Sequence, residues 1–271
     1  MTDDHLLGRL FGRKKVEIPP EDRPELFLQP SDPVPDFRLD HLDICFCGSK
    51  KYFKSCCGSK ASKRPAPFGV HVIPDYLPRS TLDEINQYLD KQNSEALMVI
   101  DDALSTKDNI VTKLDEKRVS QRVHLGEMEN KIKQIVKKAF VELVEKYYAR
   151  EMDWFETPQV LRYFPGGFYH SHADSENLDI ETACWHKVID RDVSLLIYLN
   201  DDFEGGELSF DKFHYQLQPK AGMAVIFPSD HRYMHTAQTV YEGMRQAIVS
   251  WGSIKGIHKI SKSLPEAAIQ Y

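Results

Sequence analysis

The apolar residues of this chain follow two spacings, one helical and one typical of short strands. Between residues 128 and 149 they recur every three or four positions, which predicts an amphipathic helix with one buried face. A shorter helix is expected from Thr81, because Thr81 and Glu84 have the spacing of a capping box and Leu82, Ile85 and Leu89 would face inward. A strand is expected before it, at residues 70–73.

From Thr157 onward the pattern predicts short strands separated by glycine-containing turns. The expected strands cover residues 159–164, 193–200, 206–210, 213–218, 223–227, 234–240 and 246–252. The run from Leu195 to Leu199 is apolar on both faces, as in a strand buried between a sheet and flanking helices. The pattern therefore predicts a mainly β fold, a sandwich or barrel with flanking helices.

Composition narrows the functional classes. The 271 residues include 35 Lys and Arg against 41 Asp and Glu, and the resulting net charge of −6 disfavours nucleic-acid binding. There is no run of 18 apolar residues, so no membrane span is expected. The N-terminal residues lack the apolar core of a secretory signal, which favours a reducing cytoplasm. Prolines spread through residues 1–40 predict an extended arm.

Four of the five cysteines are clustered. Cys45, Cys47, Cys56 and Cys57 form a C-x-C-x8-C-C pattern, which can hold a single Zn²⁺ tetrahedrally. The alternative is four free or oxidised thiols. Cys184 has no partner nearby in the sequence and is interpreted as a packed thiol.

A second metal site is expected around an H-x-D motif. His172 and Asp174 lie two residues apart, so in an extended strand they project from the same face. With the distant His235 they would form the 2-His-1-carboxylate triad of non-haem Fe(II) oxygenases. Such a triad leaves three iron positions open, which a 2-oxo acid and dioxygen can fill. Two alternatives stay open: His170 in place of His172, and His231 in place of His235.

Both regions resemble known families. The cysteine segment is similar to the SEC-C motif, the zinc-binding module of the SecA translocase, with Lys50 where a second glycine is usual. Residues 70–253 resemble the prolyl 4-hydroxylase branch of Fe(II)/2-oxoglutarate dioxygenases. The shared elements are Tyr163-x-x-Gly166, Tyr169-x-x-His172-x-Asp174, Leu196–Asn200, Gly205–Leu208, Phe227–Ser229, His235–Val240, Gly243–Arg245 and Trp251.

This resemblance implies a double-stranded β-helix, or jelly roll, and a role for each matching residue. His172, Asp174 and His235 would bind Fe(II). Arg245, ten positions after His235, would pair with the far carboxylate of 2-oxoglutarate, although many animal relatives have lysine there. Tyr163 would donate its hydroxyl to the same carboxylate.

Tyr169 and Trp251 would flank a substrate proline. The alternatives are a surface ion pair for Arg245 and simple core packing for Tyr169 and Trp251. Residues 175–191 form an insert that could act as a mobile lid, and Cys184 and His186 are interpreted as loop residues within it.

The expected organisation is an arm at 1–40, a zinc knuckle at 41–60, an oxygenase domain at 66–255 and a tail at 256–271.

The expected function is prolyl hydroxylation of a protein or peptide, using Fe(II), 2-oxoglutarate and O₂, with structural Zn²⁺ and with ascorbate as an optional addition. Alternatives are hydroxylation of another residue or of a small molecule, or a binding adaptor whose oxygenase fold is idle. The knuckle could recruit a chaperone, a translocase or a ribosome-associated partner. A nucleic-acid demethylase of the AlkB type ranks lower, because Trp251 stands where that class has a second arginine.

Overall fold

The computed structural model describes residues 34–35, 45, 49–56, 59, 66–100, 112–114 and 116–271. Within this part of the chain the fold is built mainly from antiparallel strands, with two α-helices, α1 (Arg79–Leu89) and α2 (Glu129–Tyr148). No described helix is both long enough and apolar enough to cross a membrane.

The two helices bury the faces that the sequence predicts. In α1, Leu82, Ile85 and Leu89 are buried, but the helix begins at Arg79 and its N-cap residue Pro78 makes no side-chain hydrogen bond. The expected capping box is therefore wrong, because Thr81 lies inside the first turn rather than before it. Helix α2 closely matches the predicted range, and its C-cap residue Ala149 has a left-handed backbone conformation.

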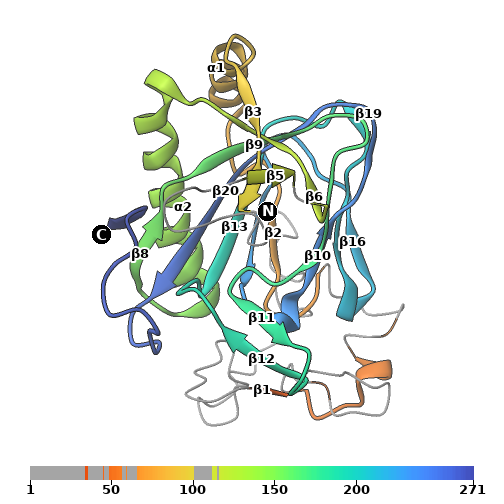
Figure 1. Cartoon of the computed structure of the whole chain (residues 1–271). Coiled ribbons are helices and arrows are strands. Elements are labelled where there is room, and N and C mark those ends of the chain that lie inside the picture. Colours follow the sequence, from red (N-terminus) through yellow and green to blue (C-terminus); the bar gives the residue numbers. More distant parts are fainter. Residues whose placement is uncertain are drawn as a thin grey trace, which may run out of the picture.

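A large sheet forms one side of the fold (Figure 1). Its strands follow the order β2-β17-β13-β20-β9-β7-β3, with β8 paired to β20 and β21 paired to β8. Their bounds are β2 (His71–Ile73), β3 (Ser94–Ala96), β7 (Gln121–Val123), β8 (Met152–Glu156), β9 (Gln159–Tyr163), β13 (Val193–Tyr198), β17 (Ala224–Pro228), β20 (Arg245–Ile254) and β21 (Ala268–Gln270).

A smaller sheet faces the large one, with strand order β16-β15-β18-β10-β6. Its strands are β6 (Arg118–Val119), β10 (Phe168–His172), β15 (Leu208–Phe210), β16 (Tyr215–Leu217) and β18 (His235–Ala237). Further strand pairs are β4 (Met98–Ile100) with β5 (Thr112–Leu114), and β14 (Phe203–Gly205) with β19 (Val240–Gly243).

The chain alternates between the two sheets. It runs from β9 in the large sheet to β10 in the small one, back to β13, then to β15 and β16, to β17, to β18 and finally to β20. This winding is the double-stranded β-helix, or jelly roll, that the sequence predicts. Two antiparallel sheets joined in this way enclose one apolar layer between them.

Each face of the large sheet has its own core. The outer face packs against α1 and α2, with Ile85, Val136, Phe140, Ile197 and Ile248 among the fully buried residues. The inner face packs against the small sheet and contributes the apolar side chains Leu161, Leu196, Val225 and Val249. Alternation along the strands produces this division, because successive side chains point to opposite faces. The inner layer is the one that surrounds the functional site.

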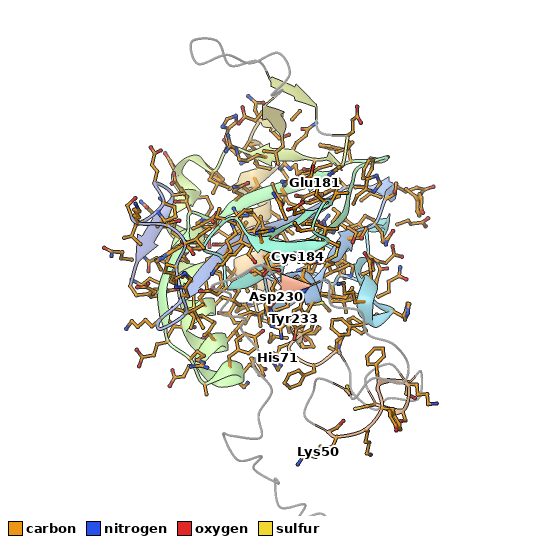
Figure 2. The ribbon with its side chains drawn as sticks, turned by 60° about the horizontal axis from the view of Figure 1, so that its bottom comes forward. Lys50, His71, Glu181, Cys184, Asp230 and Tyr233 are labelled. Atoms are coloured by element: carbon orange, nitrogen blue, oxygen red, sulfur yellow. The ribbon has the colours of Figure 1, made fainter. Side chains whose placement is uncertain are left out.

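The insert after Asp174 is ordered. It contains a hairpin, β11 (Glu176–Asp179) and β12 (Cys184–Lys187), and β12 also pairs with β1 (Val34–Pro35). Cys184 and His186 therefore lie in a strand, so their assignment to a loop is wrong. Figure 2 shows Cys184 in this hairpin, on the side of the molecule where Asp230 and Tyr233 lie.

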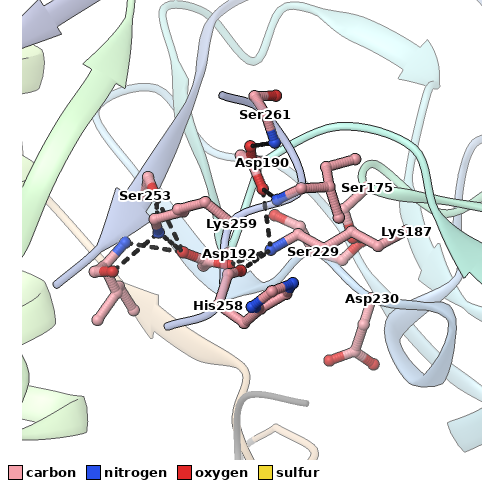
Figure 3. A network of polar contacts seen from close by, with 12 residues as sticks. Ser175, Lys187, Asp190, Asp192, Ser229, Asp230, Ser253, His258, Lys259 and Ser261 are labelled. Carbon is pink, nitrogen blue, oxygen red and sulfur yellow. Dashed lines mark hydrogen bonds and ion pairs between the residues drawn. The ribbon is translucent and has the colours of Figure 1, made fainter. Parts of the chain in front are cut away.

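The segment expected as a separate tail, residues 256–271, packs on the large sheet. Strand β21 extends the large sheet, and Lys259 contacts Asp192 at the start of β13 (Figure 3). Asp192 also accepts hydrogen bonds from Lys187 and from the backbone of Ile254. This buried carboxylate thus ties the hairpin, the last long strand and the C-terminal segment together.

Candidate functional site

His172, Asp174 and His235 converge in one cavity, which is lined by residues of both sheets. One ligand atom from each lies within 4.8 Å of the other two. The Nε2 atom of His172 is 3.5 Å from Asp174 Oδ1, and the Nε2 atom of His235 is 3.6 Å from Asp174 Oδ2. These are the separations expected of donors arranged around one small cation, and two imidazoles with one carboxylate are the donor set of the Fe(II) facial triad.

The strands of the small sheet bring the two histidines together. His172 ends β10 and is the direct cross-strand partner of His235, the first residue of β18. The register shifts between Tyr169 and His172, so strict alternation is broken there. This bulge lets Tyr169 stack on His172, with ring centroids 3.6 Å apart, although the residues are three positions apart. Asp174 follows in a bend rather than in the strand.

Backbone carbonyls fix both imidazoles. His172 Nδ1 lies 2.8 Å from the carbonyl oxygen of His170, and His235 Nδ1 lies 3.1 Å from that of Tyr233. In each ring Nδ1–H donates to the carbonyl, which leaves the Nε2 lone pair directed towards the site. This is the usual way in which proteins orient metal-binding histidines.

The charge state of the site suits metal binding. Burial lowers the pKa of His235 to about 4, with a further contribution from His172, so the ring is neutral at neutral pH. Burial opposes ionisation of Asp174, but His235, His172 and Ser194 outweigh it, so the pKa of this carboxyl lies well below its usual range. A neutral His235 imidazole and an ionised Asp174 carboxylate are the forms of these two groups that bind a divalent cation.

A serine that the sequence analysis did not single out orients the carboxylate. Ser194 Oγ donates a 2.6 Å hydrogen bond to Asp174 Oδ2, and lies 2.7 Å from Ser229 Oγ. The backbone N–H of Asp174 donates to the carbonyl of Ser229. The signal was available, since Ser194 is the polar residue in an otherwise apolar strand, but its partner could not be known before the strands were placed.

Arg245 lies deeper in the same cavity, fully buried on β20. Its guanidinium donates to the Tyr198 hydroxyl over 3.3 Å and lies over the Tyr163 ring, 4.8 Å from the centroid. Its Nε is buried without any hydrogen-bond partner, and no carboxylate pairs with Arg245 in the described part of the chain. The surface ion pair considered as an alternative is therefore wrong. A buried, unpaired cation calls for an anionic ligand.

Tyr198 is a second residue missed from the sequence. Its side chain is fully buried, and burial raises the pKa of its hydroxyl, which stays protonated and can donate to an anion beside Arg245. Tyr198 is the direct cross-strand partner of Ala247. The small Ala247 side chain lies between the larger residues Arg245 and Val249 on the same face of β20.

Tyr169 and Trp251 both line the cavity, which has a volume of about 230 Å³. Trp251 is partly exposed, and the guanidinium carbon of Arg191 lies 3.8 Å from its ring centroid. Arg191 is held in turn by two hydrogen bonds to the Glu156 carboxylate. The two aromatic rings therefore belong to the cavity wall rather than to the closed core.

The structure argues against the two alternative metal ligands, His170 and His231. His170 is exposed and packs against Phe168, away from the cavity. His231 is buried: its Nδ1 lies 2.5 Å from Glu176 and its ring stacks on Trp185. Neither is among the ligand atoms that converge.

The expected zinc cysteines are only partly described. Cys45 is buried, and Cys56 Sγ lies 3.1 Å from Ser49 Oγ next to the short helix η3 (Phe53–Ser55). Cys47 and Cys57 lie outside the described residues. The expectation of a zinc knuckle therefore stays a prediction.

Comparison with known proteins finds similarity in the segment that contains the three converging residues. Residues 158–253 match the family model of the 2OG-Fe(II) oxygenase superfamily. The chain is 34% identical over 97 residues to prolyl 3-hydroxylase 2 of Rattus norvegicus, covering 32% of this chain and 14% of that protein. It is 38% identical over 89 residues to prolyl 3-hydroxylase 3 of Mus musculus, covering 30% of this chain and 12% of that protein.

One similar solved structure is a prolyl hydroxylase from Trichoplax adhaerens in complex with a hypoxia inducible factor peptide fragment. Its TM-score is 0.49 and its identity 20%, over 68% of this chain and 83% of that one. The chain spans only a small part of the curated relatives that it matches. The segment that matches the 2OG-Fe(II) oxygenase superfamily contains His172, Asp174, His235 and Arg245.

Proposed function

We propose that this chain is an Fe(II)- and 2-oxoglutarate-dependent hydroxylase that acts on a prolyl residue of a protein or peptide. The observation that carries the proposal is the convergence of His172, Asp174 and His235 in the same cavity as the buried, unpaired Arg245. The prolyl substrate is supported by the prolyl hydroxylases among its relatives and by Tyr169 and Trp251 in the cavity wall.

The donor set fits the implied groups. His172 Nε2, Asp174 and His235 Nε2 would hold Fe(II), and Arg245 with the Tyr198 and Tyr163 hydroxyls would hold the far carboxylate of 2-oxoglutarate. An arginine binds a carboxylate through two parallel hydrogen bonds, so a single bound orientation is selected. When bound, Fe(II) with 2-oxoglutarate and O₂ supplies C–H hydroxylation coupled to formation of succinate and CO₂.

The protein's own residues orient the metal ligands and the substrate. Ser194 keeps the Asp174 carboxylate in one orientation, and the backbone carbonyls of His170 and Tyr233 keep both imidazoles in the metal-binding tautomer. Leu161, Leu196, Leu208 and Val249 give the cavity an apolar wall. Tyr169 and Trp251 would hold the substrate ring so that one C–H bond faces the iron.

The proposal includes the N-terminal cysteines. Cys45, Cys47, Cys56 and Cys57 would bind one structural Zn²⁺, and a reducing cytoplasm would keep these thiols available for it. The knuckle would help to dock a protein substrate or a chaperone, translocase or ribosome-associated partner. Deletion of residues 1–60 should then lower activity on an intact protein substrate more than on a short peptide; equal losses would reject docking.

The hydroxylase proposal is tested by incubating the Fe(II)-loaded protein with 2-oxoglutarate, O₂ and proline-containing peptides. Mass spectrometry should detect one added oxygen on proline, with one succinate per hydroxylation, with or without ascorbate as an accessory reductant. The Asp174→Ala variant is the control and should form neither product. Turnover of free amino acids alone would overturn the prolyl assignment, and no succinate from iron-loaded protein would favour a binding adaptor.

A further inference from the structure

The cavity has a charge opposite to that of the chain as a whole. Four arginines line it, Arg118, Arg122, Arg191 and Arg245, and Asp174 is the only carboxylate among the described lining residues. The chain as a whole carries a net charge of −6. A concave site lined by one sign of charge concentrates ligands of the opposite sign, so this cavity favours anionic ligands.

Two of the arginines are already neutralised by the protein. Arg122 pairs with Glu95 at 2.6 Å, and Arg191 forms a two-point ion pair with Glu156 at 2.6 and 2.7 Å. Neither guanidinium therefore needs a substrate carboxylate. Arg245 is the deep cation already assigned to 2-oxoglutarate.

Arg118 is the remaining arginine, and it lacks such a partner. Its Nε donates to Ser120 Oγ at 2.8 Å, and its guanidinium carbon lies 4.8 Å from the centroid of the Tyr169 ring. Within the described part of the chain, the Ser120 bond is the only hydrogen bond of this side chain, and no carboxylate pairs with it. Both terminal amino groups can therefore donate to a ligand in the cavity.

The position of Arg118 relative to the triad is fixed by the sheet. Arg118 is the direct cross-strand partner of Tyr169, and Tyr169 stacks on His172 with 3.6 Å between ring centroids. The guanidinium thus lies over the phenol ring, and this ring stacks on the imidazole of a proposed iron ligand. Because an extended chain advances about 3.3 Å per residue, this stack spans about three residues of a bound peptide.

We propose that Arg118 binds an acidic side chain of the substrate, located within about three residues of the residue that is hydroxylated. The inference rests on the proposed function, since it concerns the substrate of the same site. A guanidinium can take both oxygens of an Asp or Glu carboxylate, and the pair would form in a partly enclosed cavity where screening is reduced. The substrate class is therefore an acidic peptide segment.

The test uses labelled peptides with one proline and with Asp, Asn or Lys at each of the three positions on either side. Fluorescence anisotropy measures their binding to the full chain loaded with Fe(II) and 2-oxoglutarate without oxygen. At one or more positions, the Asp peptide should bind roughly tenfold more tightly than its Asn counterpart. In Arg118→Gln this ratio should fall to about one, and Arg118→Glu should favour the Lys peptide. Arg118→Lys should keep part of the preference.

Arg122→Gln is the matched control, because its guanidinium is already paired with Glu95, and it should leave the ratio unchanged. The affinity for 2-oxoglutarate, measured separately, should be unaltered in Arg118→Gln, which shows that the variant is folded. The proposal is overturned if wild type has no preference for Asp at any position, if Arg118→Gln retains it, or if Arg122→Gln loses it equally. Charge-selective binding without succinate formation would instead reject only the proposed hydroxylation.

Discussion

The hydroxyl of Ser194 donates a 2.6 Å hydrogen bond to Oδ2 of Asp174, and both side chains are buried. Without this bond the carboxylate could rotate, and one of its oxygens would be left without a partner away from water. Ser194 therefore acts as a positioning residue for the proposed iron ligand. Hydrogen-bond partners of metal ligands commonly affect metal affinity by 10- to 100-fold, so the contact should be measurable.

We expect Ser194→Ala to weaken Fe(II) binding by roughly 10- to 100-fold, as measured by anaerobic metal titration. Ser229→Ala is the control, because it removes the hydroxyl behind Ser194 but leaves the Ser194–Asp174 bond in place. Its effect should be smaller. Wild-type Fe(II) affinity in Ser194→Ala would show that the bond does not position the carboxylate.

Arg245 and Tyr198 should together determine 2-oxoglutarate affinity. Arg245→Gln removes a buried charge that would pair with a carboxylate, and we expect the Kd for 2-oxoglutarate to rise by roughly 100-fold. Tyr198→Phe removes one hydrogen bond to that charged group, and the expected rise is roughly tenfold. Calorimetry with the metal-loaded protein measures both, and Fe(II) affinity should be unchanged. A variant that loses Fe(II) instead would contradict this division of roles.

His71 should make the fold sensitive to acid. Burial lowers its pKa to about 4 from an ordinary value of 6.5, and its ring stacks on Tyr147 with centroids 4.2 Å apart. The unfolded chain therefore binds a proton at this residue between pH 6.5 and pH 4, whereas the folded chain does not. The free energy of unfolding should fall as the pH decreases through this window, by up to about 3 kcal/mol.

Urea unfolding at pH 7 and pH 4.5 checks this expectation, with His71→Phe as the comparison. Phenylalanine keeps an aromatic ring beside Tyr147 but has no proton to bind, so the variant should lose less stability on acidification than the wild type. His235 has a similarly low pKa and contributes the same trend in both proteins. An identical loss in both proteins would exclude His71 as a source of the acid sensitivity.

Asp192 should contribute strongly to stability, because it joins three separate segments. Its carboxylate accepts from Lys187 at 2.9 Å and from Lys259 at 2.8 Å in a buried cluster (Figure 3). Asp192→Ala would leave these ammonium groups without that partner, and we expect a loss of about 3 kcal/mol in the free energy of unfolding. Lys255→Ala breaks only an exposed ion pair with Glu151 and should cost less than about 1 kcal/mol. Equal losses would contradict the structural role of Asp192.

The sequence predicts the mainly β fold from local patterns, whereas the jelly roll and the roles of the triad residues come from the family resemblance. Patterns of apolar residues locate several strands of both sheets, including β9, β13, β17 and β20. The H-x-D motif with His235 names the three side chains that converge. The hairpin of residues 176–187 is missed because polar and charged residues hide its alternation. The burial of His231 is missed because it depends on Glu176 and Trp185, whose positions only the folded chain determines.

The stack of Tyr169 on His172 could not be predicted from alternation either. Regular strand geometry places residues three positions apart on opposite faces, and only the bulge in β10 brings these two rings together. The contact between Tyr198 and Arg245 could not be predicted from alternation either, because the two residues lie on neighbouring strands that are far apart in the sequence. Long-range pairings of this kind are set by the three-dimensional fold.

The most direct test of the account is an anaerobic titration of 2-oxoglutarate into the Fe(II)-loaded chain, followed by visible absorption. Chelation of Fe(II) by a 2-oxo acid gives a charge-transfer band, which should reach its full intensity at one 2-oxoglutarate per chain. The band should be absent in His235→Ala and should need much higher 2-oxoglutarate in Arg245→Gln. No band in the wild type, or an unchanged band in His235→Ala, would contradict an iron site built from His172, Asp174 and His235.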